Sequence, residues 1–380
     1  MYKKIKVAHV LQSVGGVDVY LRLISENTNP NEISHVIIHQ KDPSKHLYLN
    51  NNKKIKEYYL PIKREINFLS DLKSIIKTVK YLKKEKPDIL HAHSAKGGIV
   101  ARVTSLFYRV NVLYTPHAFS YLSTSSNLKK QLFLRIEQLF KHFNSIILAT
   151  SQSERYRAIN EVGYKENRSI VFNNSILPID KTKLDYSIIN ELKLPEQYIC
   201  TVGRPSYQKN IEFMIDVIYK LKEKTPQIHL VIMGVGEYSP NLEIVKEKIE
   251  RLKLSTNITL VNWIERQNIF SIISKSMLYI STSRYEGLPY SVIESLALSK
   301  AGVVTNCDGN IDLIKNDFNG YVIEQGDLEE FCKMTHKLLI DENLRMRFEK
   351  ESQSLFEDNF NIKKNIYLLE EIYKNYAKTN

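Results

Sequence analysis

The amino-acid sequence predicts an α/β protein with two parallel-sheet domains. Short apolar segments rich in β-branched residues alternate with segments of helical periodicity, which is typical of parallel strands covered by helices on both faces. The alternation pauses at residues 173–184, which contain Asn-Asn and Pro178 and show little periodicity. The length of 380 residues also favours two domains, because one domain usually has ~100–200 residues. We therefore expect one sheet on each side of a linker at 173–184.

In the first half, an apolar strand at 5–11 is followed by a turn with two glycines and a helix at 17–24. Residues 71–84 have apolar side chains at positions 72, 75, 76, 79 and 82, which is helical spacing, and Pro87 ends this helix. Further strands are expected at 35–39, 88–91, 112–115, 145–149 and 170–172.

The second half repeats this order, starting with a strand at 198–202 and a helix at 211–222. We expect further strands at 229–233, 258–261, 278–281, 302–305 and 320–323, and further helices at 242–252, 291–298 and roughly 328–378. Ligands of open parallel sheets bind outside the carboxyl ends of the strands. Functional residues are therefore expected in the loops that follow strands.

The composition excludes several classes of protein. Hydrophobic residues make up 43% and charged residues 25%, which rules out collagen-like, low-complexity and wholly disordered chains. The three cysteines form no CxxC pair, which argues against a disulfide scaffold or zinc knuckle and favours a reducing cytosol. The longest uncharged run, 110–128, is too polar for a membrane span, and the first 13 residues are interpreted as a strand rather than a signal peptide.

The charge is distributed unevenly. The net charge is +12, and residues 1–178 hold 28 Lys and Arg against 13 Asp and Glu, while residues 179–380 hold 26 against 29. A basic first half suggests an anionic partner, which could be nucleic acid, a membrane surface or a phosphorylated substrate; a generally lysine-rich composition is the alternative. No recognisable nucleic-acid module is present, so nucleic acid is disfavoured.

The first strand-following loop, 13–16, contains Gly15 and Gly16. Paired glycines before a helix allow a phosphate to approach the backbone and the free N–H groups of the helix start. A plain tight turn is the alternative. The loop is not GxGxxG and no acidic residue follows at the ribose spacing, which disfavours a nicotinamide cofactor.

The second loop starts at Gly203-Arg204 and ends at Lys209-Asn210 before a helix. Arg offers a planar fork and Lys a point charge, and two such cations after a strand suit a diphosphate. Two solvated surface cations are the alternative, which we consider weaker for this arrangement.

The third loop carries Glu286 and Glu294 with seven residues between them, the second within a predicted helix. A Glu in the first turn of a helix can accept hydrogen bonds from a ribose diol, while the helix N–H groups meet phosphate oxygens. Gly287 allows close backbone approach. A Glu that merely compensates the helix dipole is the alternative.

The fourth loop, Tyr114-Thr-Pro-His117-Ala-Phe, places a histidine after a first-half strand. His117 could bond a substrate hydroxyl or share a developing charge. A lone histidine more often has a structural role.

Together and in this order, these motifs resemble those of the retaining family 4 glycosyltransferases, which have the GT-B fold. The resemblance spans essentially the whole chain and includes a late loop at 308–312. Within the family the chain is most similar to bacterial enzymes that build capsule or O-antigen repeat units, through His91-Ala-His93-Ser-Ala-Lys96-Gly and the His117 loop.

The resemblance implies two Rossmann-like domains that face a cleft. The acceptor-side domain would be 1–176 and the nucleotide-sugar domain 177–358, with a C-terminal helix at 359–380 that packs back toward the first domain. It also implies that the transferred sugar keeps its anomeric configuration and that the donor is a nucleotide-sugar, for which we expect a UDP-sugar.

The resemblance assigns roles residue by residue. Arg204 and Lys209 would hold the donor diphosphate and stabilise the leaving nucleotide. Glu294 would bind the ribose and Glu286 the donor sugar, with His117 near the reacting carbon. The remaining donor-site residues would be Gly15, Gly16, Gly203, Asn210, Gly287, Leu288 and Tyr290. The family needs no metal, and the sequence has no D-x-D triplet, so no metal or other cofactor is expected.

Three positions depart from the family pattern. Val17-Asp18 stands where the first loop often has a Glu after an Ala. The late loop has Asp308-Gly309-Asn310-Ile311-Asp312 in place of Gly-Gly-x-Pro-Glu, which puts its sugar contacts in doubt. Asn262 replaces a glycine before the loop expected to contact the base.

The acceptor is expected on the basic first domain. Residues 127–143 form an amphipathic pattern with basic residues on the acceptor and membrane side, namely Lys129, Lys130, Arg135 and Lys141. We expect peripheral attachment to the cytoplasmic face of the inner membrane, near a polyprenyl-diphosphate-linked saccharide acceptor. The alternative is that the apolar face packs on the sheet and the lysines are merely solvated.

Two other functions fit the same fold. One is a sugar-nucleotide epimerase or phosphorylase, which the Arg204/Lys209 and Glu286/Glu294 motifs disfavour. The other is a catalytically silent subunit that binds a glycan lipid or a partner enzyme, for which the altered 308–312 loop leaves room.

Overall fold

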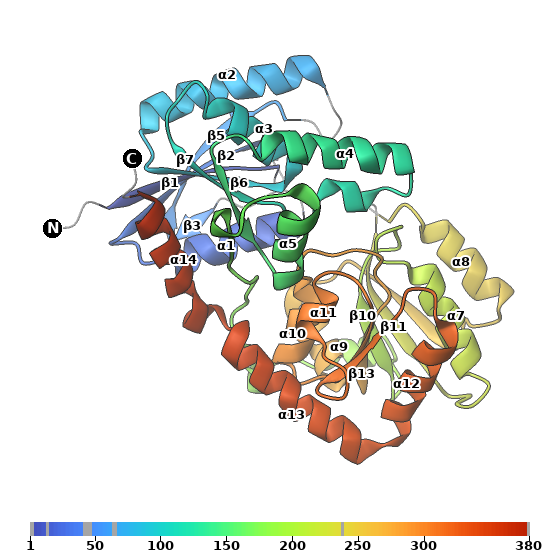
Figure 1. Cartoon of the computed structure of the whole chain (residues 1–380). Helices are drawn as coiled ribbons and strands as arrows, with labels where there is room; N and C mark the ends of the chain where they lie inside the picture. The colour runs from blue at the N-terminus through green and yellow to red at the C-terminus, as the bar shows by residue number, and fades with distance from the viewer. Residues whose placement is uncertain (1–3, 13–14, 41–47, 63–66, 237–238, 378–380) are drawn as a thin grey trace. The chain divides into compact units, whose positions relative to one another are not determined.

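A computed structural model describes residues 4–12, 15–40, 48–62, 67–236 and 239–377. The chain divides into two compact units, Met1–Leu177 with Ile362–Asn380, and Pro178–Asn361. Each unit contains one parallel sheet with helices against it (Figure 1). The predicted fold class, two Rossmann-like parallel-sheet domains, is confirmed.

The first unit contains a sheet with the strand order β5-β2-β1-β6-β7-β8-β9, and every adjacent pair of these described strands is parallel. Its strands are β1 (Ile5–Val10), β2 (Ile33–Gln40), β5 (Lys56–Leu60), β6 (Ile89–His93), β7 (Asn111–Thr115), β8 (Ser145–Ala149) and β9 (Ser169–Val171). A short antiparallel pair, β3 (Leu49–Asn50) and β4 (Lys53–Lys54), lies outside this sheet. The helices are α1 (Gly16–Asn27), α2 (Phe68–Glu85), α3 (Ser94–Thr104), α4 (Asn127–Phe140), α5 (Gln152–Arg157) and α14 (Ile362–Ala377).

The two faces of this first sheet differ in chemistry because side chains alternate along each strand. Ala8, Val10, Leu90 and Ala92 point into an apolar core shared with α2 and α3. The opposite face of β1 and β6 carries histidines, among them His9, His91 and His93, which are fully buried. Tyr20 of α1 and Tyr373 of α14 contact these rings, so α1 and α14 cover this face.

The glycines of α3 explain how closely this helix packs on the sheet. A Cβ on Gly97 would lie 2.5 Å from the carbonyl oxygen of Val10, and one on Gly98 would lie 2.5 Å from the ring of Tyr114. Only glycine therefore lets α3 pack this closely on β1 and β7.

A buried ion pair attaches α4 to α3. The Arg102 guanidinium donates two 3.1 Å hydrogen bonds to the Glu137 carboxylate and stacks on the Tyr114 ring, whose hydroxyl donates to the other Glu137 oxygen. Both charged side chains are essentially inaccessible to solvent. Because burial removes the hydration of both charges, their pairing with these additional hydrogen bonds is what makes the position of α4 specific.

The second unit contains a sheet with the order β12-β11-β10-β13-β14-β15, again with parallel pairing of all the described neighbours. Its strands are β10 (Ile199–Val202), β11 (Leu230–Val235), β12 (Ile258–Asn262), β13 (Leu278–Ser281), β14 (Gly302–Thr305) and β15 (Gly320–Ile323). Its helices are α6 (Ser187–Glu191), α7 (Ile211–Leu221), α8 (Leu242–Arg251), α9 (Arg266–Lys275), α10 (Tyr290–Ala297), α11 (Asn310–Leu313), α12 (Leu328–Ile340) and α13 (Glu342–Asn359).

The helical segment expected at 328–378 consists of three helices rather than one run. Asp341 ends α12 and its carboxylate accepts the Leu344 N–H, so it also caps α13. The last helix, α14, begins at Ile362 and packs on α1, β1 and β6 of the first unit. The chain thus returns to its first unit, as expected for this fold. No described helix is long and apolar enough to cross a membrane.

The Arg102–Glu137 pair allows a stability prediction. Glu137→Ala leaves the Arg102 charge buried without a counterion, so we expect a loss of about 3–5 kcal/mol in the free energy of unfolding. The double variant Arg102→Met, Glu137→Leu should recover most of it, because no unpaired charge remains. Urea titrations followed by circular dichroism measure both, and equal losses in the single and double variants would contradict the prediction.

The buried histidines predict a pH-dependent stability. Burial and the like charge of neighbouring rings lower the pKa of His9, His91 and His93 well below the usual value, and burial lowers the pKa of His35 to about 3. The unfolded chain binds more protons than the folded one below about pH 6.5, so stability falls as pH falls through that value. Each histidine contributes at most about 1.4 kcal/mol per pH unit to the slope of the unfolding free energy against pH.

The measurement is the free energy of unfolding at pH 7.5 and pH 5.5. His35→Gln should lower the slope of the unfolding free energy against pH by up to the contribution of one bound proton, and the exposed His142→Gln is the control substitution. An equal slope in the wild type and His35→Gln would contradict the prediction.

Candidate functional site

In the second unit, the loops after β10 and β13 are joined at the carboxyl edge of the sheet. These strands are neighbours, and the Thr282 hydroxyl donates to the carbonyl oxygens of Lys209 and Asn210, 3.0 Å away in each case. The Arg284 N–H also donates to the Gln208 carbonyl at 2.8 Å. The parallel pairing therefore places the two sequence motifs predicted for the donor site next to each other.

Lys209 and Glu286 form an ion pair between these loops. The distance from Lys209 Nζ to Glu286 Oε1 is 2.7 Å, and the Gln208 amide donates to the other oxygen at 3.1 Å. Burial alone would lower the pKa of Lys209, but the Glu286 carboxylate raises it overall, so the ammonium stays charged. A methylene of Lys209 also lies where a side chain on Gly203 would be, 3.1 Å from that Cβ position, which favours glycine at 203.

Arg204 differs from Lys209 because no described residue pairs with its charge. The residue is half-buried at the end of β10 and makes no hydrogen bond or ion pair with another described residue. Asn210 has a left-handed backbone with φ 51° at the start of α7, and no side chain caps that helix. The loop thus combines an uncommitted guanidinium with a helix N-terminus, both of which favour an anion.

Glu294 lies in α10 and is almost fully buried, with 3% of its surface exposed. Its carboxylate is paired with the Arg266 guanidinium, the first residue of α9. Burial lowers the pKa of Arg266, with an opposing effect from Tyr290. The sequence motifs did not indicate Arg266, since it stands 28 residues before Glu294 at the start of another helix.

The late loop, whose sequence departs from the family pattern, lies against the Glu286 loop. Gly309 has φ +74°, and a Cβ there would collide with the Gly287 carbonyl and lie 2.8 Å from a Pro289 carbon. The loop continues into the short helix α11, where the buried Asn310 amide donates to the Thr305 carbonyl at 3.1 Å. The late loop therefore packs closely on the backbone of Gly287 and on Pro289.

In the first unit, Gly15 and Gly16 stand at the start of α1. Gly15 has φ 55° and ψ −127°, a conformation that L side chains rarely adopt, and a Cβ there would meet no atom within 4 Å. No side chain caps the helix start. The remainder of the predicted loop, Ser13 and Val14, lies outside the described residues.

His117 follows β7 in a strained loop, with φ 55°, and Ala118 follows with φ 77°. The Glu154 carboxylate fixes this turn by accepting the Ala118 N–H at 2.7 Å and the Thr150 N–H at 2.7 Å. Two successive left-handed residues cost energy that the surrounding structure must offset, which is common at functional sites. His117 Nε2 lies 3.3 Å from His93 Nδ1.

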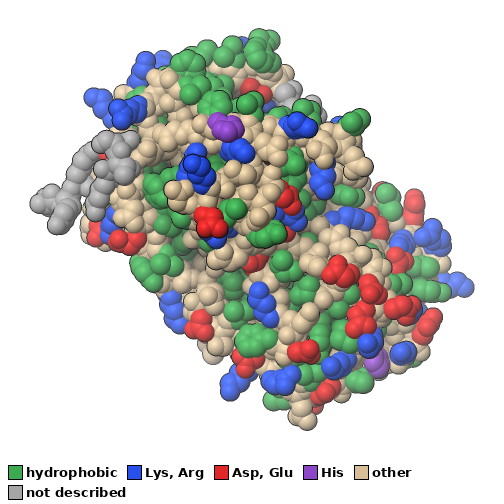
Figure 2. Space-filling model, in the orientation of Figure 1, with side chains coloured by type: hydrophobic (Ala, Val, Ile, Leu, Met, Phe, Trp, Pro, Cys, Tyr) green, Lys and Arg blue, Asp and Glu red, His purple; other side chains and the backbone are tan. Residues whose placement is uncertain are grey.

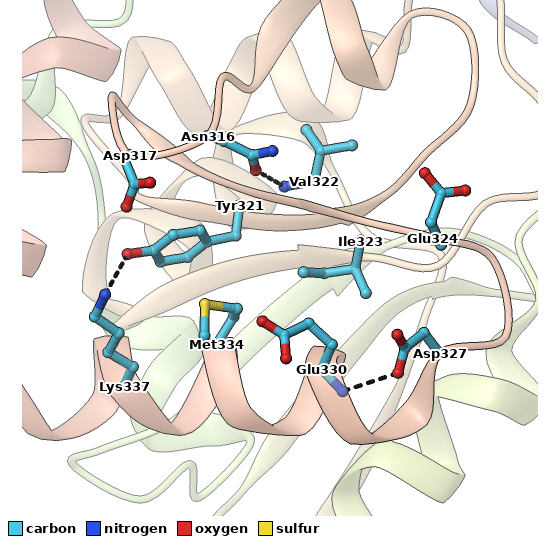
Figure 3. A pocket seen from close by; sticks show the side chains of 10 residues that line it. All are labelled: Asn316, Asp317, Tyr321, Val322, Ile323, Glu324, Asp327, Glu330, Met334 and Lys337. Atoms are coloured by element: carbon cyan, nitrogen blue, oxygen red, sulfur yellow. Dashed lines mark hydrogen bonds between the residues drawn. The ribbon is translucent and has the colours of Figure 1, made fainter.

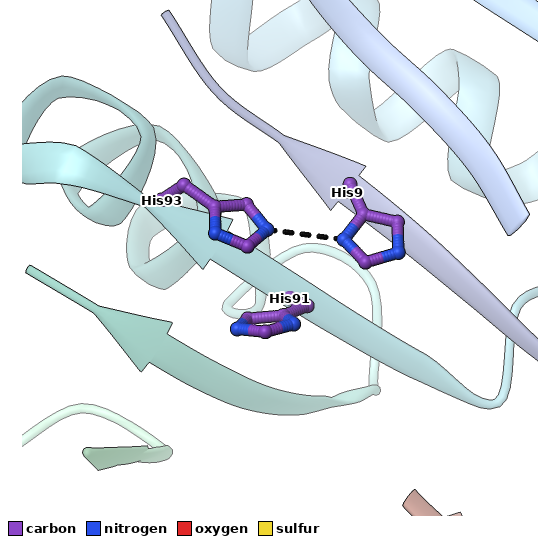
Figure 4. Close-up of side chains that lie close together, drawn as sticks. All are labelled: His9, His91 and His93. Atoms are coloured by element: carbon purple, nitrogen blue, oxygen red, sulfur yellow. Dashed lines mark hydrogen bonds between the residues drawn. The ribbon is translucent and has the colours of Figure 1, made fainter. Parts of the chain in front are cut away.

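Behind His117 lies a cluster of histidines that the sequence motifs did not reveal. One nitrogen from each of His9, His91 and His93 lies within 4.8 Å of the others, which is close enough for a shared metal ion. In Figure 4, however, His9 and His93 face each other while His91 lies beside them with its ring turned differently. The His9 Nδ1 to His93 Nε2 distance is 3.0 Å, a hydrogen bond. The signal available in the sequence was the period-two pair His91 and His93 in a buried strand.

The basic helix expected on the acceptor side is α4, which ends at Phe140 rather than 143. Lys129, Lys130 and Arg135 are exposed and Lys141 is half-buried. Three apolar residues are also exposed: Leu128 by 85%, Leu132 by 54% and Leu139 by 62%. The alternative, in which the apolar face packs on the sheet, therefore holds for Phe133 and Leu134, which pack against the core, and not for these three leucines.

Other apolar side chains are exposed on α2, namely Phe68, Leu69, Leu72 and Ile76. Figure 2 shows hydrophobic side chains gathered along the upper edge of the first unit, above the position of α2 in Figure 1, with Lys and Arg around them. The first unit thus carries an apolar and basic surface on α2 and α4.

A separate hollow of about 450 Å³ lies between β15 and α12 (Figure 3). Asp317, Glu324, Asp327 and Glu330 make it acidic, and its Lys337 donates to the Tyr321 hydroxyl at 2.9 Å. It contains none of the predicted site residues. An acidic lining repels diphosphates, so it is a poor candidate for the donor site.

The structure thus joins the loop of Gly203, Arg204, Lys209 and Asn210 to the segment that begins with Glu286 in the second unit. Gly287, Leu288, Tyr290 and Glu294 follow in that segment, and Gly15, Gly16 and His117 lie in the first unit. Apart from Gly16, Tyr290 and Glu294, which lie in helices, these residues stand in loops that follow parallel strands.

Comparison with protein families and known proteins agrees with this arrangement. Residues 14–176 match the Glycosyltransferase Family 4 model and residues 184–355 match the Glycosyl transferases group 1 model. An Escherichia coli protein named UDP-Gal:alpha-D-GlcNAc-diphosphoundecaprenol alpha-1,3-galactosyltransferase is 27% identical over 98% of this chain and 97% of its own. The Staphylococcus aureus capsular polysaccharide biosynthesis glycosyltransferase CapM is 24% identical over 90% and 92%.

Solved structures share the fold. Sucrose-phosphate synthase from Thermosynechococcus elongatus superposes with a TM-score of 0.85 at 16% identity, covering 99% of this chain and 100% of its own. Anabaena HepE in complex with UDP-glucose superposes with a TM-score of 0.81 at 17% identity, covering 98% and 100%. From its two matched family models and its two parallel-sheet units, the chain belongs to the family 4 glycosyltransferases with the GT-B fold.

Proposed function

We propose that this glycosyltransferase moves a sugar from a UDP-sugar to a polyprenyl-diphosphate-linked saccharide, with retention of the anomeric configuration and without a metal, in the assembly of a surface polysaccharide. The observation that carries the proposal is the cationic edge of the second sheet. There Arg204, which pairs with no described residue, lies in the same loop as Lys209 of the Lys209–Glu286 pair and the start of α7, which no side chain caps.

The charges at this edge suit a nucleotide diphosphate that leaves during the reaction. Arg204 would bind the diphosphate directly, and Lys209 would share its ammonium between Glu286 and a phosphate oxygen. Together with the N–H groups at the starts of α7 and α10, these cations would stabilise the negative charge that grows on the leaving nucleotide. This is the role that a metal ion has in other glycosyltransferases, and it supports a metal-independent reaction.

The two carboxylates have binding roles in this proposal. Glu294 would accept hydrogen bonds from the ribose hydroxyls, sharing its carboxylate with Arg266 or exchanging that partner for the ribose. Glu286, held by Lys209 and Gln208, would contact the donor sugar, and His117 would lie near the reacting carbon. Gly15, Gly16 and Asn210 would allow close approach of the phosphates.

The reaction would be a displacement on one face of the sugar. The acceptor oxygen would attack the face that the diphosphate leaves, and a leaving phosphate oxygen would take the acceptor proton. The new glycosidic bond forms as the bond to the diphosphate breaks, so retention requires no covalent intermediate with Glu286 or Glu294.

The lipid-linked acceptor is supported by the name of the Escherichia coli relative and by the surface of the first unit. Leu128, Leu132 and Leu139 lie within about 40° of one another around α4, so they form one exposed apolar stripe. The exposed Arg135 lies beside this stripe around the helix, while Lys129 and Lys130 stand farther round it. All three would attract an anionic leaflet. We propose that this surface holds the enzyme peripherally on the cytoplasmic face of the inner membrane.

A transfer assay tests the function. The protein is incubated with a panel of UDP-hexoses and UDP-N-acetylhexosamines and a polyprenyl-diphosphate-linked GlcNAc, and the product is analysed by mass spectrometry and by NMR for anomeric configuration. Transfer with retention, unaffected by EDTA, is expected. UDP binding without transfer to any acceptor would favour the catalytically silent subunit, and a changed donor without transfer would favour the epimerase.

Arg204 and Lys209 should respond differently to substitution. Arg204→Ala should weaken UDP binding roughly tenfold to hundredfold, as for a lost charge-assisted hydrogen bond, while the stability changes by no more than about 0.5 kcal/mol. Lys209→Ala should weaken binding and also destabilise the fold by about 1–3 kcal/mol, because Glu286 loses its counterion. Calorimetric titration with UDP and urea unfolding measure both. A large stability loss in Arg204→Ala, or none in Lys209→Ala, would show that the assignment of the two cations is wrong.

The membrane surface of α4 can be tested with vesicles. Lys129→Gln combined with Lys130→Gln should weaken binding to phosphatidylglycerol vesicles roughly 30-fold, since each basic residue near the surface contributes about 1 kcal/mol. Leu128→Ser combined with Leu132→Ser should weaken vesicle binding more strongly than the lysine substitutions do when the salt concentration is high. Ile340→Ser, which removes an equally exposed apolar side chain from the second unit, is the matched control. Vesicle binding by all variants as strong as wild type would exclude this surface.

A further inference from the structure

Four histidines of the first unit form one hydrogen-bonded chain that ends at His117. From Thr28 Oγ1 the chain runs 2.7 Å to His35 Nε2, and from His35 Nδ1 it runs 2.9 Å to His9 Nε2. It continues 3.0 Å from His9 Nδ1 to His93 Nε2 and 3.3 Å from His93 Nδ1 to His117 Nε2. Each of the three inner rings uses both nitrogens, and each is at least nine-tenths buried.

A neutral imidazole has one N–H donor and one lone pair, so every ring in such a chain must donate in the same direction. Only two proton arrangements are therefore possible. In one, His117 Nε2 donates to His93 and the chain ends with His35 donating to the Thr28 hydroxyl. In the other, the Thr28 hydroxyl donates to His35 and His93 donates to His117.

The neutrality of the rings is supported by their environment. Burial is the main cause that lowers the pKa of every ring in the chain, to about 3 for His35 and His117 and well below the usual value for His9 and His93. No carboxylate is hydrogen-bonded to any of these four described rings that would stabilise a charged form.

The far end of the chain distinguishes the two arrangements. Thr28 Oγ1 lies 3.4 Å from the Ser25 carbonyl, and the Asn50 amide donates to Oγ1, also at 3.4 Å. If His35 donates to Thr28, the hydroxyl accepts two hydrogen bonds and donates its proton to Ser25, which uses its full capacity. If Thr28 instead donates to His35, the bond to Ser25 is lost. The first arrangement makes one more hydrogen bond.

We propose that His35, His9 and His93 are positioning residues that hold His117 as the tautomer with the proton on Nε2. Nδ1 of His117 then carries a lone pair, and it has no hydrogen-bond partner among the residues that the structure describes. His117 therefore offers a hydrogen-bond acceptor, which fits a sugar hydroxyl and not a phosphate oxygen. This inference rests on the proposed function, because it identifies the chemistry that His117 presents to the donor sugar.

A metal ion on His9, His91 and His93 is the competing explanation of this cluster. The hydrogen bonds of the unit argue against it. His91 Nδ1 lies 2.8 Å from the Tyr373 hydroxyl and its Nε2 lies 2.9 Å from the Thr115 hydroxyl, so both nitrogens are engaged outside the chain. His9 Nδ1 and His93 Nε2 are bonded to each other. A shared ion would break at least two of these bonds.

The tautomer can be observed directly in the free protein. Protein labelled with [15N]histidine gives long-range 1H–15N spectra in which protonated and unprotonated ring nitrogens have distinct shifts, and His117→Gln assigns the signals of His117. We expect a protonated Nε2 and an unprotonated Nδ1 at pH 7.5. A protonated Nδ1 on His117 would overturn the proposal.

Two variants separate positioning from folding. His9→Gln interrupts the chain and should produce a mixture of His117 tautomers, whereas His91→Gln removes an equally buried ring outside the chain and should leave the His117 tautomer unchanged. If His9→Gln does not fold, Thr28→Val is used instead, because it removes only the hydroxyl that orients the chain. An unchanged tautomer in a folded interrupting variant would contradict the proposal.

Activity and metal titration complete the test. With the accepted UDP-sugar and its monodeoxy analogues, the interrupting variant should lose about threefold to tenfold in kcat/KM for the parent sugar but little for the analogue that lacks the hydroxyl bonded by His117.

Addition of Zn²⁺ to the labelled wild type should leave the signals of His9, His91 and His93 in place, and their stoichiometric shift would overturn the proposal in favour of a metal site. The expected tautomer in a protein without transferase activity would refute the proposed function and not the chain.

Discussion

The parallel pairing of strands is the constraint on which the rest of this structure depends. In a parallel sheet all carboxyl ends meet at one edge, so loops far apart in sequence become neighbours once the strand order is established. The β10–β13 pair brings Lys209 and Glu286 within 2.7 Å across 77 residues of chain. The β1–β6 pair does the same for His9 and His93 in the first unit.

The donor edge shows how a site can be organised before its ligand arrives. Glu286 holds the Lys209 ammonium in place, whereas the Arg204 guanidinium pairs with no described residue. Because Lys209 is already oriented, the ordering of its long side chain need not be repeated when a diphosphate binds. The Arg266–Glu294 pair similarly prevents a buried carboxylate from standing without a counterion.

The first sheet combines two kinds of core. Its apolar face packs on α2 and α3 and supplies the hydrophobic stabilisation, while its opposite face carries imidazoles that satisfy one another under α1 and α14. Buried polar groups of this kind are tolerated only when their hydrogen bonds are complete, and they then specify one arrangement. The return of α14 to this unit contributes Tyr373, whose hydroxyl completes the bonding of His91.

The sequence by itself determined the two sheets, nearly all of their strands, and the loops that carry the glycines, cations and carboxylates, because hydrophobic periodicity and turn residues are local signals. It did not reveal β5, α3 or α9, and it did not separate α12 from α13, because the cap at Asp341 is a single residue within a long helical pattern. Only the tertiary structure decided that Lys209 pairs with Glu286, that Glu294 pairs with Arg266, and that Leu128, Leu132 and Leu139 remain exposed. It alone also joined His35, His9, His93 and His117 into a chain. These relations depend on which strands become neighbours and which face of each strand a side chain occupies, and no local pattern in the sequence contains that information.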